Sequence, residues 1–293
     1  GAVFTENLDV FGVELVAVCD RNEERVRVFA KQHGAAGYTD FDAFIEHDMD
    51  AVVVANYFHQ HAPFAIRALR AGKHVMSETS ACRTIQEGVE LVREVERSGK
   101  IYMFAENYAY FSASQEMRKQ YRQGAIGEIR YAEGEYVHPM STEQALLLAP
   151  GFSHWRNVMP SMYYNTHALA PLMYITDTMP IRVNGLSIAD PEQEKKSIRK
   201  GDPGFVILCR MNNGAVFRLY GTRLPGERIS YKLTGSRGYM ENIGGMHEGK
   251  VRIAREEWNL LPGEEKEVIL TAQFDSHAEL AKKAGHGGGD FWT

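Results

Sequence analysis

Two residues near the start of the chain have the spacing of a dinucleotide-binding site. Asp20 ends the apolar run 14–20 ("ELVAVCD"), and Gly1 lies 19 residues before it. A glycine-rich turn that leads into a helix binds a pyrophosphate through backbone N–H groups, and an acid about 20 residues later accepts the ribose hydroxyls. An acid after a strand also often caps the next helix, so the surrounding pattern has to decide between the two interpretations.

The surrounding pattern favours the cofactor. Over the first hundred residues, apolar runs alternate with amphipathic helices, which is typical of a parallel sheet with helical crossovers. On this interpretation Gly1 is the last glycine of a GxGxxG motif, and the first strand of the domain is missing. Asp20 repels a 2′-phosphate, which predicts NAD rather than NADP, although Arg21 softens that preference.

Polar residues also follow the next apolar run, 50–56 ("DAVVVAN"). Ligands of open α/β sheets bind at the carboxyl ends of the strands, so we expect Asn56 and His59 to contact the cofactor. His59 and His61 have only a weak metal-binding spacing, and the three cysteines lie far apart without a CxxC pair. We therefore predict no metal site.

Charge and hydropathy exclude several classes of partner. The net charge is -5 and the pI about 6.2, and the sequence lacks a basic run, so we expect no nucleic-acid partner. No stretch approaches the roughly 18 apolar residues of a membrane span, and the start lacks a signal-peptide pattern. We expect a cytoplasmic protein with no membrane partner.

The second half of the chain has a different pattern, with long alternating segments from about residue 128 onward. The segment 204–223 ("GFVILCRMNNGAVFRLYGTR") is predicted to fold back at Asn213-Gly214 as a two-residue hairpin. Residues 162–175 are helical in character, with Pro171 predicted to bend or interrupt the helix. This half is predicted to be an antiparallel sheet.

The predicted fold class is α/β followed by α+β. Residues 1–109 are expected to form a Rossmann doubly wound parallel sheet, and residues 110–293 an α+β domain with an open, mostly antiparallel sheet.

The segment 61–78 ("HAPFAIRALRAGKHVMSE") resembles the helix and strand before the Glu-Lys-Pro motif of the Gfo/Idh/MocA family, the glucose-fructose oxidoreductase and inositol dehydrogenase group. "GVELVAVCDRNEER" and "AIGEIRYAEGEY" are also similar to that family. The resemblance implies a sugar or polyol bound between the domains beside the nicotinamide. It also implies a homo-oligomer, a dimer or tetramer, formed through the antiparallel sheet, and C-terminal helices that this chain lacks.

The motif itself departs from the family. Glu78 matches and implies a contact with the cofactor, but Thr79 stands where the lysine is expected and Ser80 where the proline is expected. Threonine neither carries a proton at neutral pH nor supplies a positive charge. A histidine, with an ordinary pKa of about 6.5, suits the base that sugar oxidation needs. His167 in "YYNTHALAP" falls at the position of the family's catalytic histidine.

Neighbouring residues are expected to contact the ligands. Tyr163 and Asn165 stand where the family has an acid and a glycine, and we expect them to bind substrate. Trp155 and Arg156 precede His167 and are expected to cover the sugar, although a Trp-Arg surface stack is the plain alternative. Asn107 is expected to hydrogen-bond cofactor or substrate.

Four stretches also resemble a branch of the superfamily, the NAD-dependent glycosidases that release N-acetylgalactosamine. They are "SETSA", "FAENYAY", "EGEYVH" and "YYNTHALAP". In that branch a sugar hydroxyl is transiently oxidised, the glycosidic substituent is eliminated, water adds, and the carbonyl is reduced again. The resemblance implies Tyr136 as the base for the carbon-bound proton if neighbouring charge lowers its pKa from about 10. Glu106 is expected to orient these groups.

Three hypotheses remain open on the sequence. The first is an NAD-dependent oxidoreductase acting on a sugar, sugar derivative or polyol. The second is a redox-neutral, NAD-dependent glycoside hydrolase. The third is a non-catalytic NAD-binding regulatory protein, which the missing lysine at Thr79 also allows.

Overall fold

The computed structural model describes residue 8 and residues 12–149, 154–191, 201–244 and 248–272. The chain divides into two compact units, Gly1–Ala105 and Glu106–Thr293. Within the described ranges, the helices are all too short or too polar to cross a membrane.

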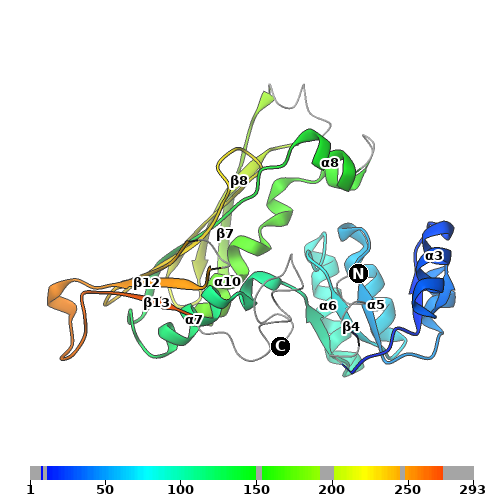
Figure 1. Cartoon of the computed structure of the whole chain (residues 1–293), viewed down its shortest axis with the longest axis horizontal. Coiled ribbons are helices and arrows are strands. Elements are labelled where there is room, and N and C mark those ends of the chain that lie inside the picture. The colour runs from blue at the N-terminus through cyan, green and yellow to red at the C-terminus, as the bar shows by residue number, and fades with distance from the viewer. Residues whose placement is uncertain (1–7, 9–11, 150–153, 192–200, 245–247, 273–293) are drawn as a thin grey trace. The chain divides into compact units, whose positions relative to one another are not determined.

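The first unit contains two parallel sheets flanked by helices (Figure 1). β1 pairs with β2, while β4 pairs with both β3 and β5. The strands are β1 Ala17–Cys19, β2 Ala36–Tyr38, β3 Ala51–Val54, β4 His74–Ser77 and β5 Tyr102–Phe104. The helices are α3 Glu23–His33, α4 Phe41–Ile45, η1 Phe58–Gln60, α5 His61–Arg70 and α6 Ile85–Ser98. The predicted parallel arrangement is confirmed. Strand β2 was not predicted, because its short "AGY" sequence lacks an apolar run.

Local sequence explains where the helices of this unit begin and end. The Asn22 side chain accepts a hydrogen bond from the Arg25 backbone N–H at the start of α3, and Gly34 ends the helix with a φ of 67°. Thr84 and Glu87 form a reciprocal capping box at the start of α6.

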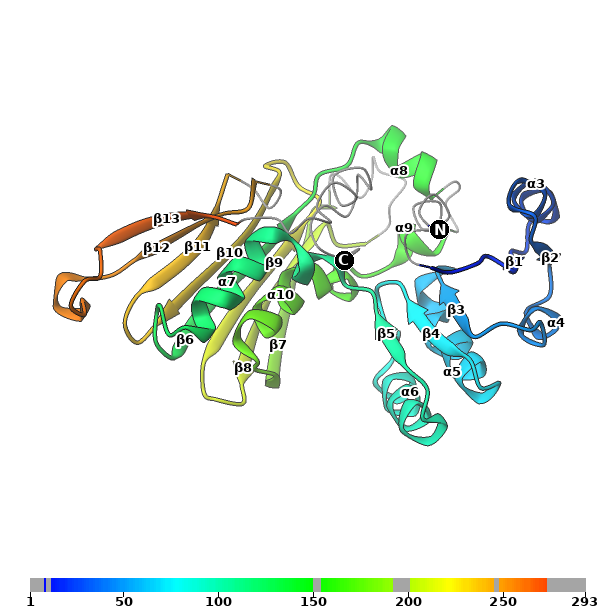
Figure 2. The same ribbon diagram turned by 60° about the horizontal axis from the view of Figure 1, so that its bottom comes forward.

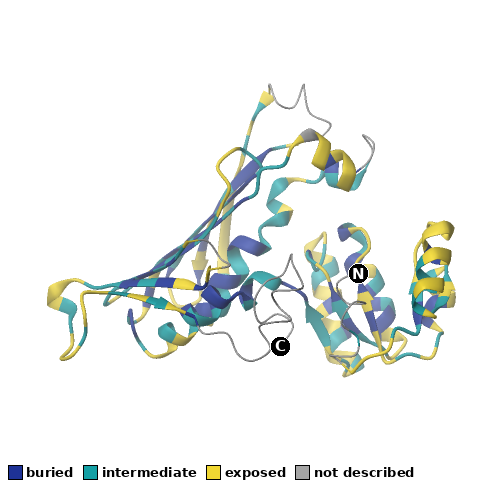
Figure 3. Cartoon of the chain, viewed as in Figure 1, coloured by how far each residue is buried: buried dark blue, intermediate teal, exposed yellow. Residues whose placement is uncertain are grey.

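Burial differs between the two faces of β3. Val52 and Val54 are buried in the core with residues of α5, whereas Ala51 and Val53 are exposed. Figure 3 colours the chain by burial, with buried residues in dark blue and exposed residues in yellow. Strand faces alternate along the chain, so α5 covers one face only. Among the described residues, the second face of β3 is not covered.

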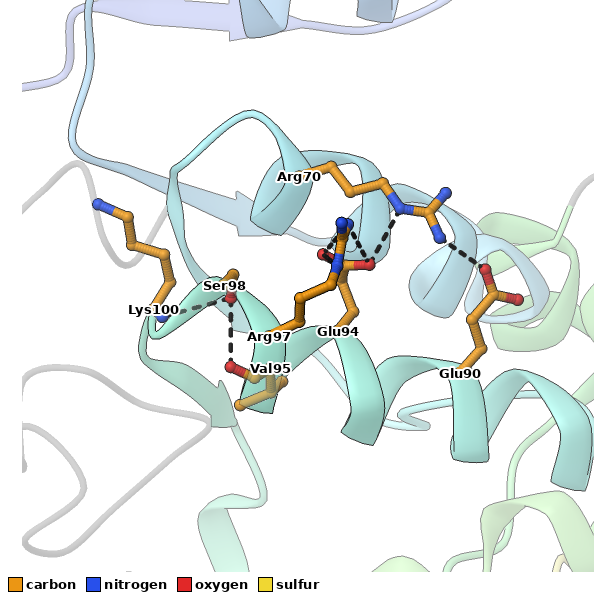
Figure 4. A network of polar contacts seen from close by, with 7 residues as sticks. All are labelled: Arg70, Glu90, Glu94, Val95, Arg97, Ser98 and Lys100. Carbon is orange, nitrogen blue, oxygen red and sulfur yellow. Dashed lines mark hydrogen bonds and ion pairs between the residues drawn. The ribbon is translucent and has the colours of Figure 1, made fainter.

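A buried carboxylate joins α5 to α6 (Figure 4). Glu94 accepts hydrogen bonds from Arg70 Nε at 3.0 Å and from Arg97 Nη2 at 2.7 Å, and Arg70 also pairs with Glu90 at 2.9 Å. Burial raises the pKa of Glu94, but the two arginines outweigh this, so that the pKa lies below its ordinary value. The pair of helices that supports β4 is therefore held by charge as well as by apolar packing.

The second unit is built on an eight-stranded sheet in the order β13-β12-β11-β10-β6-β9-β8-β7 (Figure 2). β6 lies parallel to β9, and every other pair is antiparallel. The strands are β6 Ile129–Val137, β7 Pro180–Ile188, β8 Gly204–Met211, β9 Val216–Thr222, β10 Arg228–Gly235, β11 Tyr239–Ile243, β12 Lys250–Ala254 and β13 Glu267–Thr271. The predicted open, mostly antiparallel sheet is confirmed.

Helices α7 and α10 pack on one face of this sheet and enclose the core, which includes Phe111, Met117, Leu172, Phe217 and Tyr231. The helical segments are η2 Asn107–Tyr110, α7 Ser112–Arg122, α8 Thr142–Leu148, α9 Trp155–Val158, η3 Ser161–Tyr164, α10 Thr166–Thr176 and η5 Glu257–Asn259.

Two local predictions for this unit are corrected. The β8–β9 hairpin has a three-residue loop, 212–214, because the Met211 N–H donates to the Ala215 carbonyl and Gly214 takes a φ of 89°. Pro171 lies inside α10 without interrupting it. The proline is buried within the helix.

Candidate functional site

The centre of the candidate site is a buried histidine–glutamate pair in the second unit. Glu106 immediately precedes η2, and His167 is the second residue of α10. His167 Nδ1 lies 2.7 Å from Glu106 Oε1, and the two residues are only 5% and 3% exposed. A carboxylate only accepts hydrogen bonds, so Nδ1 carries the hydrogen, and in the neutral ring Nε2 carries the lone pair. The pair has the geometry of an oriented general base.

Glu106 is itself held by the backbone and has a free acceptor. Its Oε1 also accepts a hydrogen bond from the Tyr108 backbone N–H at 3.1 Å. Its Oε2 is buried and makes no hydrogen bond to the described residues. A buried carboxylate oxygen without a donor is costly, so this atom suits a ligand that brings a hydroxyl or N–H group.

Three tyrosine rings surround the imidazole of His167. The ring centroids of Tyr108, Tyr136 and Tyr164 lie 4.4, 4.8 and 4.9 Å from that of His167. Tyr136 also contacts Tyr108 at 5.6 Å, edge to face. The structure therefore brings together the three predicted catalytic residues, His167, Tyr136 and Glu106, and adds two tyrosines that the sequence analysis did not single out.

The electrostatics of Tyr136 differ from the prediction. Burial raises the pKa of Tyr136, and the neighbouring phenols of Tyr108 and Tyr164 and the Glu106 carboxylate raise it further. Burial likewise raises the pKa of Tyr108. The expected lowering of the Tyr136 pKa by neighbouring charge is thus wrong, because the nearby groups are phenols and an acid.

The position of His167 depends on close packing between α10 and the sheet. Gly134 of β6 faces the helix, and a Cβ atom there would lie 2.0 Å from the Ala168 carbonyl oxygen. Tyr231, opposite Gly134 on β10, donates its hydroxyl to the His167 carbonyl at 2.5 Å. Both residues were missed by sequence reasoning, because each looks like an ordinary member of an alternating strand.

The residues predicted to bind substrate lie close in sequence to this pair. Asn165 donates its side-chain N–H to the Met162 carbonyl at 2.8 Å, so it shapes the junction between η3 and α10. Arg156 lies over the Trp155 ring at 4.9 Å, which is the stack considered as the alternative. Tyr163 is in η3 and 37% exposed, and Asn107 begins η2. Their roles toward a substrate or cofactor stay predictions.

The predicted cofactor residues of the first unit lie at the carboxyl ends of its strands. Asp20 follows β1, Asn56 follows β3 and Glu78 follows β4, and all three are exposed. Asp20 Oδ1 also accepts a hydrogen bond from the Asn22 N–H at 2.8 Å, so capping and cofactor binding are compatible there. Exposed acids and an amide at the carboxyl ends of these strands fit the hydroxyl-rich riboses of a dinucleotide.

The remaining cofactor predictions have different outcomes. Arg21 is exposed beside Asp20. His59 lies in η1, where burial and nearby Arg83 lower its pKa and favour the neutral ring. Gly1 lies outside the described residues.

His61 has a supporting role that its spacing from His59 did not reveal. The buried His61 ring contacts two backbone carbonyls, with Nδ1 2.8 Å from Ser80 O and Nε2 3.0 Å from Asn56 O. It thus links the segments that follow β3 and β4, both of which carry predicted cofactor residues. The described part of the chain contains no cluster of three or more potential metal ligands.

Comparison with known proteins gives one family match and many relatives. Residues 2–106 match the model of an oxidoreductase family with an NAD-binding Rossmann fold. The chain is 27% identical over 333 residues to a glycosyl hydrolase family 109 protein of Solibacter usitatus, covering 99% of this chain and 74% of that protein. It is 28% identical over 175 residues to an alpha-N-acetylgalactosaminidase of Shewanella oneidensis, covering 55% of this chain but only 38% of that protein.

Solved structures share the fold. Levoglucosan dehydrogenase, in complex with NADH and levoglucosan, aligns with a TM-score of 0.74 and 21% identity, over 92% of this chain and 76% of that chain. At this level of identity the likeness establishes the architecture alone, in which a parallel sheet is followed by a large, mostly antiparallel one.

Proposed function

We propose that the chain, whose residues 2–106 match the family model of the NAD-binding Rossmann domain of Gfo/Idh/MocA oxidoreductases, uses NAD to oxidise a hydroxyl group of a sugar, a sugar derivative or a polyol. The observation that carries the proposal is the buried His167–Glu106 pair, in which Nδ1 is fixed at 2.7 Å and Nε2 is the basic atom. It supplies the base that Thr79 cannot supply.

Each residue of the pair has a distinct task in this proposal. His167 Nε2 accepts the proton of the reacting hydroxyl, while Glu106 keeps the imidazole in the required tautomer and stabilises the positive charge that develops on it. Glu106 Oε2, which has no donor among the described residues, accepts a second hydroxyl or N–H of the substrate. Bound NAD supplies the hydride acceptor. Asp20, Asn56 and Glu78 are proposed to hold it.

A second candidate is redox-neutral hydrolysis of a glycoside. It is supported by the names of the curated relatives and by the contact between Tyr136 and His167. Oxidation of one hydroxyl acidifies the neighbouring C–H, Tyr136 takes that proton, and the glycosidic substituent leaves; water then adds and the carbonyl is reduced again. Because burial raises the pKa of Tyr136, this task requires a positive charge beside the phenol once ligands are bound.

One assay separates the two candidates. The protein is incubated with NAD and nitrophenyl glycosides or free sugars, and NADH and nitrophenol are followed together. Net NADH formation supports oxidation alone, whereas nitrophenol release without NADH and with solvent deuterium at the carbon next to the anomeric centre supports the hydrolytic cycle. Both His167→Ala and Tyr136→Phe should abolish hydrolysis, and Tyr131→Phe, on the opposite face of β6, serves as the control. Binding of NAD with neither activity supports a regulatory protein.

We also propose a homo-oligomer formed through the open face of the large sheet. This face carries paired charges, including Arg218 with Glu133 at 2.8 Å and with Glu135 at 3.0 Å, beside the exposed Leu186 and Leu208. Mixed charges and apolar side chains on one face suit a second copy of the same chain. Leu208→Glu should convert the oligomer to a monomer in sedimentation experiments, and an unchanged mass contradicts this interface.

A further inference from the structure

The proline inside α10 leaves a particular carbonyl without its helical donor. In an α-helix the C=O of residue i accepts from the N–H of residue i+4, and proline has no N–H. Pro171 is four residues after His167 and lies inside α10, so the His167 carbonyl loses its normal partner. The residue concerned is the proposed base, and it is buried, so an unpaired carbonyl there is costly.

A tyrosine from the sheet supplies the missing donor. Tyr231 of β10 is fully buried, and its hydroxyl donates to the His167 carbonyl at 2.5 Å. Burial raises the pKa of Tyr231 well above its ordinary value, which keeps the hydroxyl protonated. The backbone of β10 is fixed at this point, because Asn242 Oδ1 accepts from the Tyr231 N–H at 2.6 Å and Asn242 Nδ2 donates to Ile229 O.

The facing strand makes this hydrogen bond possible. Gly134 lies directly opposite Tyr231 in the β6–β10 pairing. Because Gly134 has no side chain, the backbone of α10 at Ala168 approaches the sheet closely, and the phenol beside it reaches the preceding carbonyl.

We infer that Tyr231 is a positioning residue for the His167 base, and that its hydroxyl replaces the helical hydrogen bond that Pro171 removes. The inference rests on the proposed role of His167 and adds to it the means by which the imidazole is held against Glu106. Tyr231 does not touch the reacting atoms in this account. Its effect passes through the backbone of α10.

A double-mutant cycle tests the inference, with Tyr231→Phe, Pro171→Ala and the two changes combined. Tyr231→Phe alone should lower kcat by about tenfold or more with KM changed much less. In the Pro171→Ala background the helix regains its own donor, so the same change should lower kcat by only about twofold. Equal losses in both backgrounds overturn the inference. Tyr131→Phe, which removes a hydroxyl bonded to Glu133 on the other face of the sheet, is the matched control.

A second readout is independent of turnover. The tautomer of His167 is measured by nitrogen NMR of histidine-labelled protein, with the signal assigned by its loss in His167→Ala. Tyr231→Phe should reduce the fraction with hydrogen on Nδ1, and Pro171→Ala should restore it. If the wild type shows no activity, the proposed function fails, and the tautomer shift still decides the positioning role. An unchanged tautomer in Tyr231→Phe overturns that role whether or not the protein turns over.

Discussion

Gly134→Ala is the sharpest test of how the base is positioned. The added Cβ would lie 2.0 Å from the Ala168 carbonyl oxygen, 3.0 Å from its carbon and 3.2 Å from Leu172 Cδ1. Two of these atoms belong to the backbone of α10, so a rotamer change does not relieve the overlap. To restore an ordinary contact of about 3.4 Å, the helix or the strand must move by roughly 1.4 Å in a close-packed core.

The expected size of the effect follows from this displacement. Overpacking of a core costs about 1–3 kcal/mol, which for a unit of this size lowers Tm by roughly 2–4 °C for each kcal/mol. A misplacement of about 1 Å at a catalytic group costs on the order of 100-fold in rate. A 100-fold loss corresponds to about 2.7 kcal/mol of activation free energy. Turnover should therefore fall by an amount comparable, in free energy, to the loss of stability, because His167 is adjacent to the displaced carbonyl.

The measurement compares this variant with a matched strand glycine. At Gly185 of β7 an added Cβ meets Met162 Sδ at 3.0 Å and Ile207 Cγ1 at 3.4 Å, which are side-chain atoms able to move. Tm is measured by calorimetry and kcat by nitrophenyl glycoside or sugar turnover in both variants. If Gly134→Ala has the same kcat and Tm as Gly185→Ala, the close approach of α10 to β6 does not position the base.

Three further predictions concern the first unit. Asp20→Ser should weaken NAD binding by about tenfold and reduce the preference for NAD over NADP. Titration calorimetry with each cofactor measures both effects. An unchanged preference for NAD means that Asp20 only caps α3. His61→Ala should weaken NAD binding although none of the residues proposed to contact NAD is changed, because the carbonyls of Ser80 and Asn56 lose the side chain that links them; unaltered NAD affinity contradicts this. Glu94→Gln should lower Tm at pH 7. Because the folded pKa of Glu94 lies below its unfolded value, the carboxylate stabilises the fold above the unfolded pKa, so the Tm difference should shrink as pH falls below about 4.5.

Patterns of local origin were predictable from the sequence. The apolar runs 14–20 and 50–56 identified β1 and β3, since a run of apolar residues depends only on neighbours in the chain. The predicted catalytic trio of His167, Tyr136 and Glu106 also lies together in the structure. Its members were found through motif resemblance rather than through periodicity.

The unpredicted parts arise from contacts between distant segments. Tyr231 gave no signal because an inward-facing tyrosine on a strand is common, and only its pairing opposite Gly134 shows what it bonds. The pKa direction of Tyr136 depends on which groups surround it, and phenols 28 residues apart in sequence, at positions 108 and 136, meet only after folding. The extra residue in the β8–β9 loop depends on strand register, which turn composition alone does not fix.

The parallel pairing of β6 with β9 also bears on how the second unit is made. β6 has its two neighbours at 216–222 and 228–235, roughly eighty to a hundred residues further along the chain. During synthesis Tyr136 and Gly134 therefore remain without sheet partners until β9 and β10 have left the ribosome. High sequence separation of this kind slows folding, and it leaves an unpaired strand open to association in the meantime. The first unit, whose strands pair with near neighbours in sequence, can fold long before the base is assembled.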